Sequence, residues 1–169
     1  LDGKIYAAGG GSIEGDGTLV DLPGNFEVFD PATGAWTTLP RVPTERIYAA
    51  GAAVDGKFYV IGGQNSLGTV FYDDVEIYDP KTGLWASGPS LSSARAPGGA
   101  AVLEGRIVVV GGRAIDGPQA TVELFDPYAG EWSLGPAALV PRSFVHPGVV
   151  RSRALAPGGI GDPGSGLLS

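Results

Sequence analysis

Three arginines recur in this chain at a spacing that suits recognition of a carboxylate. Arg46, Arg95 and Arg142 each stand nine residues before a turn position that separates two apolar segments. A guanidinium group binds a carboxylate through two parallel hydrogen bonds, so arginines gathered on one face could hold an acidic ligand. The same group can instead tie neighbouring segments together through backbone carbonyls or internal carboxylates. Both interpretations stay open on sequence alone, and our hypothesis is that the three arginines contact a ligand.

Few other side chains could do chemistry. The chain has no cysteine and a single histidine, His146, which excludes disulfides, thiolate zinc sites, cysteine nucleophiles and histidine clusters. Asp73, Asp74 and Glu76 could suggest a cation site, but their alternation with apolar residues is more typical of a solvated strand edge. We therefore expect no catalytic residue, no cofactor and no metal site.

Composition limits the class of partner. The net charge of −7 argues against nucleic acid, whose phosphates require a basic surface. No apolar run approaches the roughly 18 residues that span a bilayer, and the N-terminus lacks a basic and then apolar segment. We expect a soluble protein that binds neither nucleic acid nor membrane, in a compartment that the sequence leaves open. The absence of methionine, even at position 1, indicates a chain that was processed or derives from a longer one.

The segments that carry the arginines belong to a repeat that occurs three times. Each copy has an acidic residue and glycine, an apolar strand, a Gly-Gly doublet, a variable loop, an aromatic residue before Asp-Pro, and a tryptophan. The tryptophans recur after 49 and 47 residues, a period typical of β-propeller blades. The shared positions are Gly9, Gly10, Gly62, Gly63, Gly111, Gly112, Asp30, Asp79, Asp126, Trp36, Trp85 and Trp132.

We interpret these shared positions as structural. No helix signal or Gly-Lys-Ser/Thr sequence follows the doublets, so crowding of the backbone explains them better than a phosphate cradle. The fixed place of the tryptophans favours packing between blades over a ligand platform. In the Asp-Pro turns, proline presets φ, the aspartate can bond the backbone, and glycine supplies a positive φ.

The strand plan is clearest in the second copy. Residues 47–54 are small and apolar, which suits an innermost strand, and residues 57–61 form a buried second strand. Residues 74–78 alternate between polar and apolar, as in a half-buried third strand, and an outermost fourth strand begins near Leu84. Each copy is therefore predicted to be a four-stranded antiparallel meander in an all-β protein.

The first copy lacks an innermost strand, and the region after the third tryptophan supplies an extra one at 145–150, with His146 close to the central axis. Residues 151–159 fall in the register of a second strand, although Pro157 replaces its last apolar residue. Residues 160–169 carry no strand signal. The strands expected in the third copy are 98–103, 106–110, 121–125 and one from Glu131.

These features resemble the Kelch repeat family, whose marks are the Gly-Gly doublet, the Tyr or Phe before Asp-Pro, the later tryptophan and an arginine before the innermost strand. The resemblance implies a Kelch-type β-propeller. Three blades are too few to close a ring of about 4–8, so completion needs further blades, which we favour, or a second copy. The expected organisation is a propeller segment at 1–150, with blades at 1–40, 41–90 and 91–137 and a further inner strand at 143–150, followed by a degenerate or disordered tail at 151–169.

The resemblance also implies a function. Kelch domains mostly bind proteins as scaffold or substrate-recruiting modules, which indicates a non-catalytic module for a protein or acidic peptide. The alternative is a fragment of a carbohydrate-active propeller enzyme. A galactose-oxidase-like copper site needs the cysteine and imidazoles that this chain lacks, whereas a sialic-acid-epimerase-like site could use the three arginines with Glu14, Gln64 and Asn65.

One face of the predicted propeller is the better candidate for binding. In an antiparallel meander the arginines and the variable loops emerge on the same face, and the uniform tight turns emerge on the other. Loop-length variation on one face of a repeat array marks the binding face. The loops concerned are 11–24, 64–73 and 113–119, and the candidate residues are Arg46, Arg95, Arg142, Gln64, Asn65 and Arg113.

Overall fold

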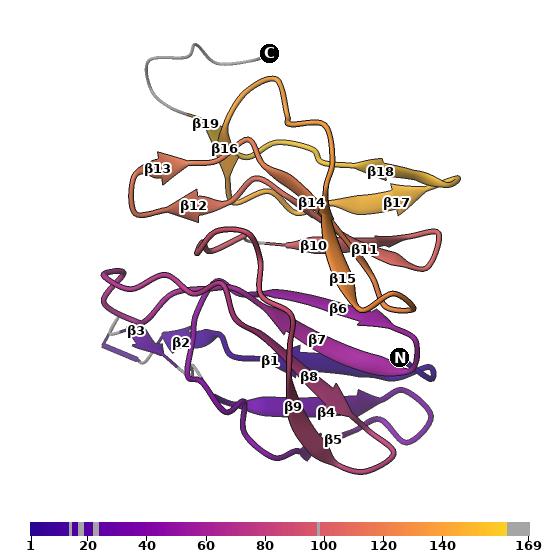
Figure 1. The fold of residues 1–169 in the computed structure, drawn as a ribbon. Coiled ribbons are helices and arrows are strands. Elements are labelled where there is room, and N and C mark those ends of the chain that lie inside the picture. Colours follow the sequence, from indigo (N-terminus) through magenta and orange to yellow (C-terminus); the bar gives the residue numbers. More distant parts are fainter. Residues whose placement is uncertain (14, 17–18, 22–23, 98, 162–169) are drawn as a thin grey trace.

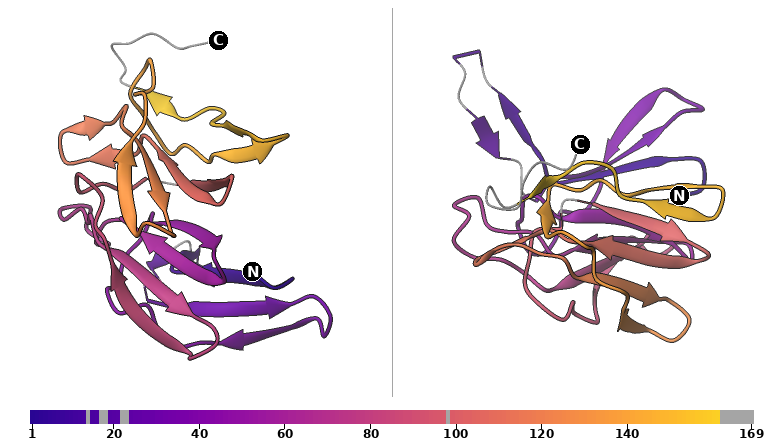
Figure 2. Two further views of the ribbon diagram at one scale, coloured as in Figure 1. Left: turned by 45° about the vertical axis from the view of Figure 1, so that its right-hand side comes forward. Right: turned by 90° about the horizontal axis from the view of Figure 1, so that it is seen from above.

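The computed structural model describes residues 1–13, 15–16, 19–21, 24–97 and 99–161, which form strands and turns without a helix. Antiparallel sheets stack face to face as blades (Figures 1 and 2). The expected all-β propeller architecture is confirmed, and the sheets do not close into a ring. Within these residues no helix is long and apolar enough to cross a membrane.

The second blade is a four-stranded sheet in the order β6–β7–β8–β9. Its first turn is a two-residue hairpin in which Asp55 and Gly56 both have positive φ, at 50° and 69°, the conformation that matches the twist of the strands. The four strands are β6 Ala50–Val54, β7 Lys57–Ile61, β8 Val75–Asp79 and β9 Leu84–Gly88.

The third blade repeats this order as β10–β11–β14–β15. Both inner strands begin two or three residues later than expected from the sequence. In the second blade Ile47 pairs with Gln64 instead, through two backbone hydrogen bonds of 2.9 Å, and the positive φ of Tyr48 turns the chain before β6. The strands of the third blade are β10 Ala100–Leu103, β11 Arg106–Val110, β14 Val122–Asp126 and β15 Glu131–Leu134.

The first blade has three strands in the order β1–β4–β5, and the described residues place no strand on the inner side of β1. Two short hairpins extend from the variable loops of the first and third blades, on the left in Figure 1. The strands of the first blade are β1 Ile5–Ala8, β4 Phe26–Asp30 and β5 Ala35–Thr38; the hairpins are β2 Gly11–Ile13 with β3 Leu19–Asp21, and β12 Arg113–Ala114 with β13 Gly117–Pro118.

After the third blade, a hairpin of β17 Gly148–Val150 and β18 Arg153–Leu155 lies beside β10, in the position of a fourth inner strand and its neighbour. The turn between them forms because Arg151 and Ser152 both take positive φ, at 47° and 60°. Here β16 Arg142–Ser143 pairs with β19 Ile160–Gly161, so regular structure reaches into the segment expected to be a tail. His146 is exposed and precedes β17.

Two hydrophobic clusters fill the spaces between blades. The cluster between blades 1 and 2 is aromatic, with Phe26 and Phe58 stacked at 5.5 Å and Tyr78 edge-on to Phe26 at 4.9 Å. The cluster between blades 2 and 3 is mainly aliphatic and contains Ile61 and Ile107, both with no exposed surface. The blades therefore stabilise one another by burying the faces that neither could cover alone.

The repeated tryptophans join successive blades. Trp85 packs 4.9 Å from Phe26 of the preceding blade, and its indole nitrogen donates a 2.9 Å hydrogen bond to the Pro40 carbonyl. Trp132 makes the matching 2.8 Å bond to the Pro89 carbonyl. Trp36 holds the same repeat position but is 54% exposed, because no described blade lies before it.

Candidate functional site

The loop face of the molecule comprises the described residues of the variable loops, 9–13, 15–16, 19–21, 24–25, 62–74 and 111–121, and the connections that lead into the inner strands, which include residues 40–49, 89–97 and 99. These segments lie on the left in Figure 1, on the side of β2, β3, β12 and β13. The opposite side, here called the turn face, carries the Asp-Gly and Asp-Pro turns. The candidate arginines and the aromatic residues described below lie at the loop face.

Arg46 is buried, with 2% of its surface exposed, and its donors are engaged within the second blade. Nη1 donates to the carbonyls of Gly62 and Asp74 at 2.9 and 3.2 Å. Nη2 lies 3.1 Å from a Glu76 carboxylate oxygen. Since Gly62 and Asp74 flank the loop between β7 and β8, this one guanidinium holds both ends of that loop.

Arg95 repeats the arrangement in the third blade and has no exposed surface. Its Nη2 lies 2.6 Å from a Glu123 oxygen, and its Nε donates to the Gly111 carbonyl at 3.1 Å. The two carboxylates also accept hydrogen bonds from the backbone. Glu123 accepts one of 3.0 Å from the Ser92 amide, and Glu76 accepts one from the Thr44 amide. Each Arg–Glu pair thus binds the incoming connection and the variable loop to the same blade.

Arg142 differs from the other two arginines. It is partly exposed, and its Nη1 donates to the Gly158 carbonyl at 3.1 Å, which repeats the Arg46 bond to Gly62. Among the described residues, no carboxylate contacts its guanidinium. Arg142 therefore has the backbone contact of its counterparts without the ion pair.

The geometry of Arg46 and Arg95 is that of the second interpretation given above, in which the arginines tie segments of the chain together through carbonyls and internal carboxylates. Each guanidinium is bonded inside its own blade. Glu76 requires a correction: it is 7% exposed and ion-paired, so it does not lie on a solvated strand edge. The signal for its role was present in the sequence, because glutamates recur at the arginine period in Glu27, Glu76 and Glu123.

The loop candidates shape the loop face in different ways. Asn65 organises its own loop, since its side-chain oxygen accepts the amides of Thr69 and Val70 at 2.9 and 3.1 Å. Gln64 continues the backbone ladder to Ile47. Arg113 is exposed at the start of the β12–β13 hairpin. Glu14, by contrast, lies outside the described residues.

An aromatic pair that the sequence reasoning missed lies at the entry to the inner strands. The rings of Tyr48 and Phe144 meet edge-to-face at 5.8 Å, although they belong to the second blade and the C-terminal hairpin region. They are 51% and 40% exposed, and both have positive φ, at 54° and 56°. Bulky residues rarely adopt this backbone conformation, which is concentrated at functional sites. The available sequence signal was their shared position, two residues after an arginine.

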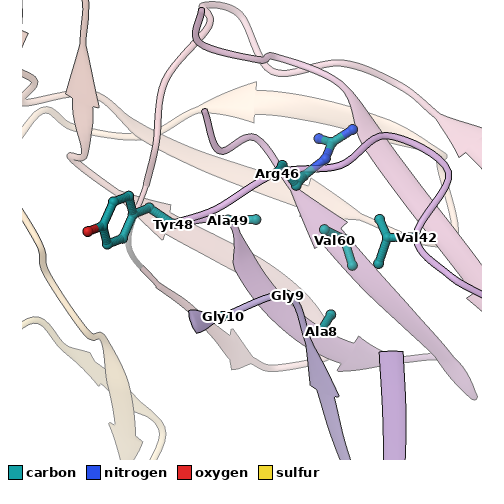
Figure 3. A pocket seen from close by; sticks show the side chains of 8 residues that line it. All are labelled: Ala8, Gly9, Gly10, Val42, Arg46, Tyr48, Ala49 and Val60. Atoms are coloured by element: carbon teal, nitrogen blue, oxygen red, sulfur yellow. The ribbon is translucent and has the colours of Figure 1, made fainter. Parts of the chain in front are cut away.

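A small pocket opens beside Tyr48, where blades 1 and 2 meet (Figure 3). Its volume is 160 Å³, below the roughly 300–1,000 Å³ of pockets that enclose a small-molecule ligand. Tyr48 extends away from the Arg46 guanidinium in Figure 3, so the two side chains face different surroundings. The pocket is lined by Ala8, Gly9, Gly10, Val42, Arg46, Tyr48, Ala49 and Val60.

The Gly-Gly doublets make close contacts in blades 2 and 3 but not at this junction. In blades 2 and 3 the second glycine donates to the carbonyl of the next arginine, Gly63 to Arg95 and Gly112 to Arg142, each at 2.9 Å. A Cβ on Gly112 would lie 2.7 Å from the Pro97 backbone, whereas one on Gly10 would meet nothing within 4 Å. The doublets therefore permit close approach of blades, and at the first junction the space is left as the pocket.

At the turn face, the carboxylates of Asp30 and Asp126 form hydrogen bonds within the chain. Asp30 accepts the Ala32 amide at 2.9 Å and pairs with Lys4 at 3.1 Å, and the hydrogen bond to Lys4 is the main cause that lowers the pKa of this carboxyl. In the third blade the Ala129 amide is the main cause that lowers the pKa of Asp126, with further contributions from Tyr128 and Arg106. These aspartates stabilise turns. Over the described part of the chain, no group of three or more His, Asp or Glu side chains is placed to hold a metal ion.

Comparison with known proteins agrees with this architecture. The family model described as Kelch motif matches residues 45–92 and 94–137. An F-box/kelch-repeat protein of Arabidopsis thaliana is 38% identical over 64 residues, which cover 38% of this chain and 15% of that protein. The Kelch-like protein terF of Aspergillus terreus is 44% identical over 66 residues, covering 37% and 14%. The matched region thus spans only about one seventh of the length of these relatives.

The fold also resembles a solved structure. The structure of YjhT superposes with a TM-score of 0.77, over 98% of this chain and 58% of that one. Sequence identity over the superposition is 20%, so this likeness establishes the fold alone.

Proposed function

The chain belongs to the Kelch-repeat family, since the two matched motifs span more than half of it, and we propose that it is a non-catalytic binding module for a protein partner. The proposed contact surface is the loop face. The observation that carries this proposal is the half-exposed Tyr48–Phe144 pair, in left-handed backbone conformation, next to a side-chain-sized pocket.

The chemistry of this surface favours a protein over a small molecule. Exposed aromatic side chains are the residues that most often dominate the free energy of protein–protein association. The pocket has room for one side chain of a partner, and its lining combines polar groups with apolar side chains such as Val42 and Val60. A partner segment could place an apolar side chain there and cover the Tyr48 ring.

Arg46 and Arg95 are proposed to position this surface. Their ion pairs with Glu76 and Glu123 fix the loops that flank it, and their charge is already balanced. The hypothesis of an acidic partner therefore depends on Arg142 and Arg113, which have no carboxylate partner within the described part of the chain. Among the described residues, no observation favours the alternative of a carbohydrate-active enzyme.

The proposal can be tested with a photo-crosslinking amino acid. It would replace Leu67, which is 83% exposed on the loop face, or Tyr128, which is fully exposed on the turn face and serves as the matched control. In extract from the source organism we expect one discrete crosslinked protein from position 67 and none from position 128. An excess of unlabelled chain should compete with this product.

The aromatic pair is then tested directly. The double substitution Tyr48→Ala and Phe144→Ala should weaken affinity for the captured protein by at least about tenfold, the loss expected for interface anchors. Thermal unfolding of the variant reports whether its blades remain intact. Equal capture from both faces, or an affinity unchanged in the double variant, would contradict the proposed surface.

A further inference from the structure

Two variable loops each present one aliphatic side chain at the loop face. Leu67 lies in the loop between β7 and β8 and is 83% exposed, and Ile115 lies in the turn between β12 and β13 and is 77% exposed. The two residues follow the Gly-Gly doublets at nearly the same distance, four residues after Gly63 and three after Gly112. Their loops belong to the two four-stranded blades and extend toward the same side of the molecule (Figure 1).

The blade 2 loop holds Leu67 through hydrogen bonds centred on Asn65. The Asn65 side chain accepts the Thr69 and Val70 amides and donates a 3.0 Å bond to the Thr69 hydroxyl. The Asn65 amide donates to the Val70 carbonyl at 3.0 Å, and its carbonyl accepts the Gly68 amide at 2.9 Å. These bonds join the residues on the two sides of Leu67, so they fix the backbone that carries this side chain.

The blade 3 hairpin fixes Ile115 in a comparable way, because β12 and β13 pair on either side of it. The Gln119 side-chain nitrogen donates to an Asp116 oxygen at 2.9 Å and to the Gly117 carbonyl at 3.1 Å, which closes the turn. The buried arginines of the two blades hold both loops at their bases. A loop that is ordered before binding loses less conformational entropy in a complex, so both residues are suited to act as anchors.

The position of the two side chains indicates the shape of their partner. A side chain at the tip of a loop can lose most of its exposed surface only if the other molecule surrounds it, as the pockets that receive interface anchors do. Two such tips on neighbouring blades require a surface that is wide enough to reach both. A folded protein with apolar recesses meets both conditions, whereas a short extended peptide does not.

The charge near the tips indicates the chemistry around those recesses. Asp116 is exposed next to Ile115, and Asp74 is exposed at the end of the blade 2 loop, whereas Arg113 is the exposed cation of these two loops. The balance is negative, as is the net charge of −7 for the whole chain. This charge would repel the anionic headgroups of a lipid surface and would attract lysine or arginine side chains of a protein.

We propose that Leu67 and Ile115 are paired anchors that insert into two apolar recesses of one folded protein, and that basic side chains of that protein face Asp116. This inference rests on the proposed function and adds the shape and charge of the partner. The Tyr48–Phe144 pair and the two loop tips then contact the same protein at different points of the loop face.

Affinity measurements on the full chain test the anchors, with the protein captured by crosslinking, in pure form, as the probe. Leu67→Asp and Ile115→Asp should each weaken binding by at least about tenfold, and the two losses should multiply in the double variant because separate recesses act independently. Leu67→Met should stay within about threefold, since it keeps the apolar volume. Leu84→Asp is the matched control, because Leu84 is 68% exposed beside an Asp-Pro turn on the turn face, and should leave affinity unchanged. Thermal unfolding should not change in these variants, since all three side chains are exposed.

The charge is tested separately. Asp116→Asn removes the charge but keeps an oxygen that can accept the bond from Gln119. It should weaken binding about threefold at low salt, the loss of an exposed ion pair, and should reduce the dependence of affinity on salt. Vesicles of phosphatidylcholine and phosphatidylserine should not bind the unaltered chain in co-sedimentation.

The outcomes separate this inference from the proposed function. Single tip variants that bind as tightly as the unaltered chain, when the variant with Tyr48→Ala and Phe144→Ala does not, would overturn the inference and leave the proposed function standing. A linear segment of the captured protein that binds as tightly as the whole would also overturn it. So would binding to the vesicles, or a salt dependence that Asp116→Asn leaves unchanged. If position 67 captures no protein, the proposed function and this inference fail together.

Discussion

The junction between blades 2 and 3 is closed at the loop face, whereas the junction between blades 1 and 2 is open there. At the closed junction the Gly63 amide donates to the Arg95 carbonyl at 2.9 Å, and a Cβ on Gly62 would lie 2.5 Å from the same oxygen. At the open junction Gly10 has free space, and the pocket beside Tyr48 occupies it. The same Gly-Gly sequence therefore serves as a contact in one place and as the wall of a potential binding site in the other.

The arginines show the same dependence on surroundings. Arg95 is fully buried between a carboxylate and carbonyls. Arg142, at the same repeat position, is partly exposed, and within the described part of the chain its guanidinium bonds only to backbone carbonyls. The repeat specifies where a residue lies in the blade. The neighbouring blade decides how deeply it is buried, and thus how much stability depends on it.

The largest difference in stability is expected between these two arginines. Arg95→Ala leaves the Glu123 carboxylate buried without its partner, which should lower the free energy of unfolding by about 3–5 kcal/mol. Arg142→Ala should cost about 1 kcal/mol or less, because it removes an exposed hydrogen bond. Denaturant unfolding monitored by tryptophan fluorescence measures both.

A paired substitution separates ion-pair loss from general disruption. Arg95→Met with Glu123→Leu removes both charges and should recover part of the loss, because a well-packed apolar pair often replaces a buried ion pair at little cost. Equal losses for Arg95→Ala and Arg142→Ala would show that burial does not distinguish the two positions.

The second contrast concerns the glycine doublets. Gly112→Ala should cost about 2–3 kcal/mol, since the new Cβ would lie 2.7 Å from the Pro97 backbone. Gly10→Ala meets no neighbour within 4 Å and should cost about 1 kcal/mol, from the left-handed backbone alone. Thermal denaturation of the two variants gives the comparison. If Gly10→Ala were as costly as Gly112→Ala, the first junction would be as tightly packed as the others.

The sequence could predict the blades but not how each motif is used. The hairpin strands 57–61 and 106–110 match the expectation residue for residue. The inner strands begin late because Tyr48 adopts a left-handed conformation, which no local pattern signals in a bulky residue. The sequence left open whether the arginines bind a ligand or tie segments of the chain together, and Arg46 and Arg95 each pair with a glutamate of the same blade. A search for glutamates at the arginine period could have revealed these partners.

The third contrast compares two tryptophans. Trp85→Phe removes the 2.9 Å bond to the Pro40 carbonyl and part of the contact with Phe26, and should cost about 1–2 kcal/mol. Trp36→Phe affects a residue that is 54% exposed and should change stability by less than about 0.5 kcal/mol. Urea midpoints of the two variants measure the difference. A large loss from Trp36→Phe would mean that another blade covers this residue in solution.

The smallest effect is expected at the turn face, and it depends on pH. The pKa values of Asp30 and Asp126 lie below the ordinary value of 3.8 because Lys4, Arg106 and turn amides favour the ionised carboxyls. Their contribution to stability is present above the pKa of the unfolded chain and is lost as pH falls from about 4 through the lower folded-state pKa. Both carboxyls are solvent-exposed, so salt should reduce the part that comes from ion pairing.

The variant with Asp30→Asn and Asp126→Asn should therefore have a flatter dependence of urea midpoint on pH between about 4 and 2.5 than the unaltered chain. An equally steep acid limb in that variant would assign the acid sensitivity to other carboxyls of the chain.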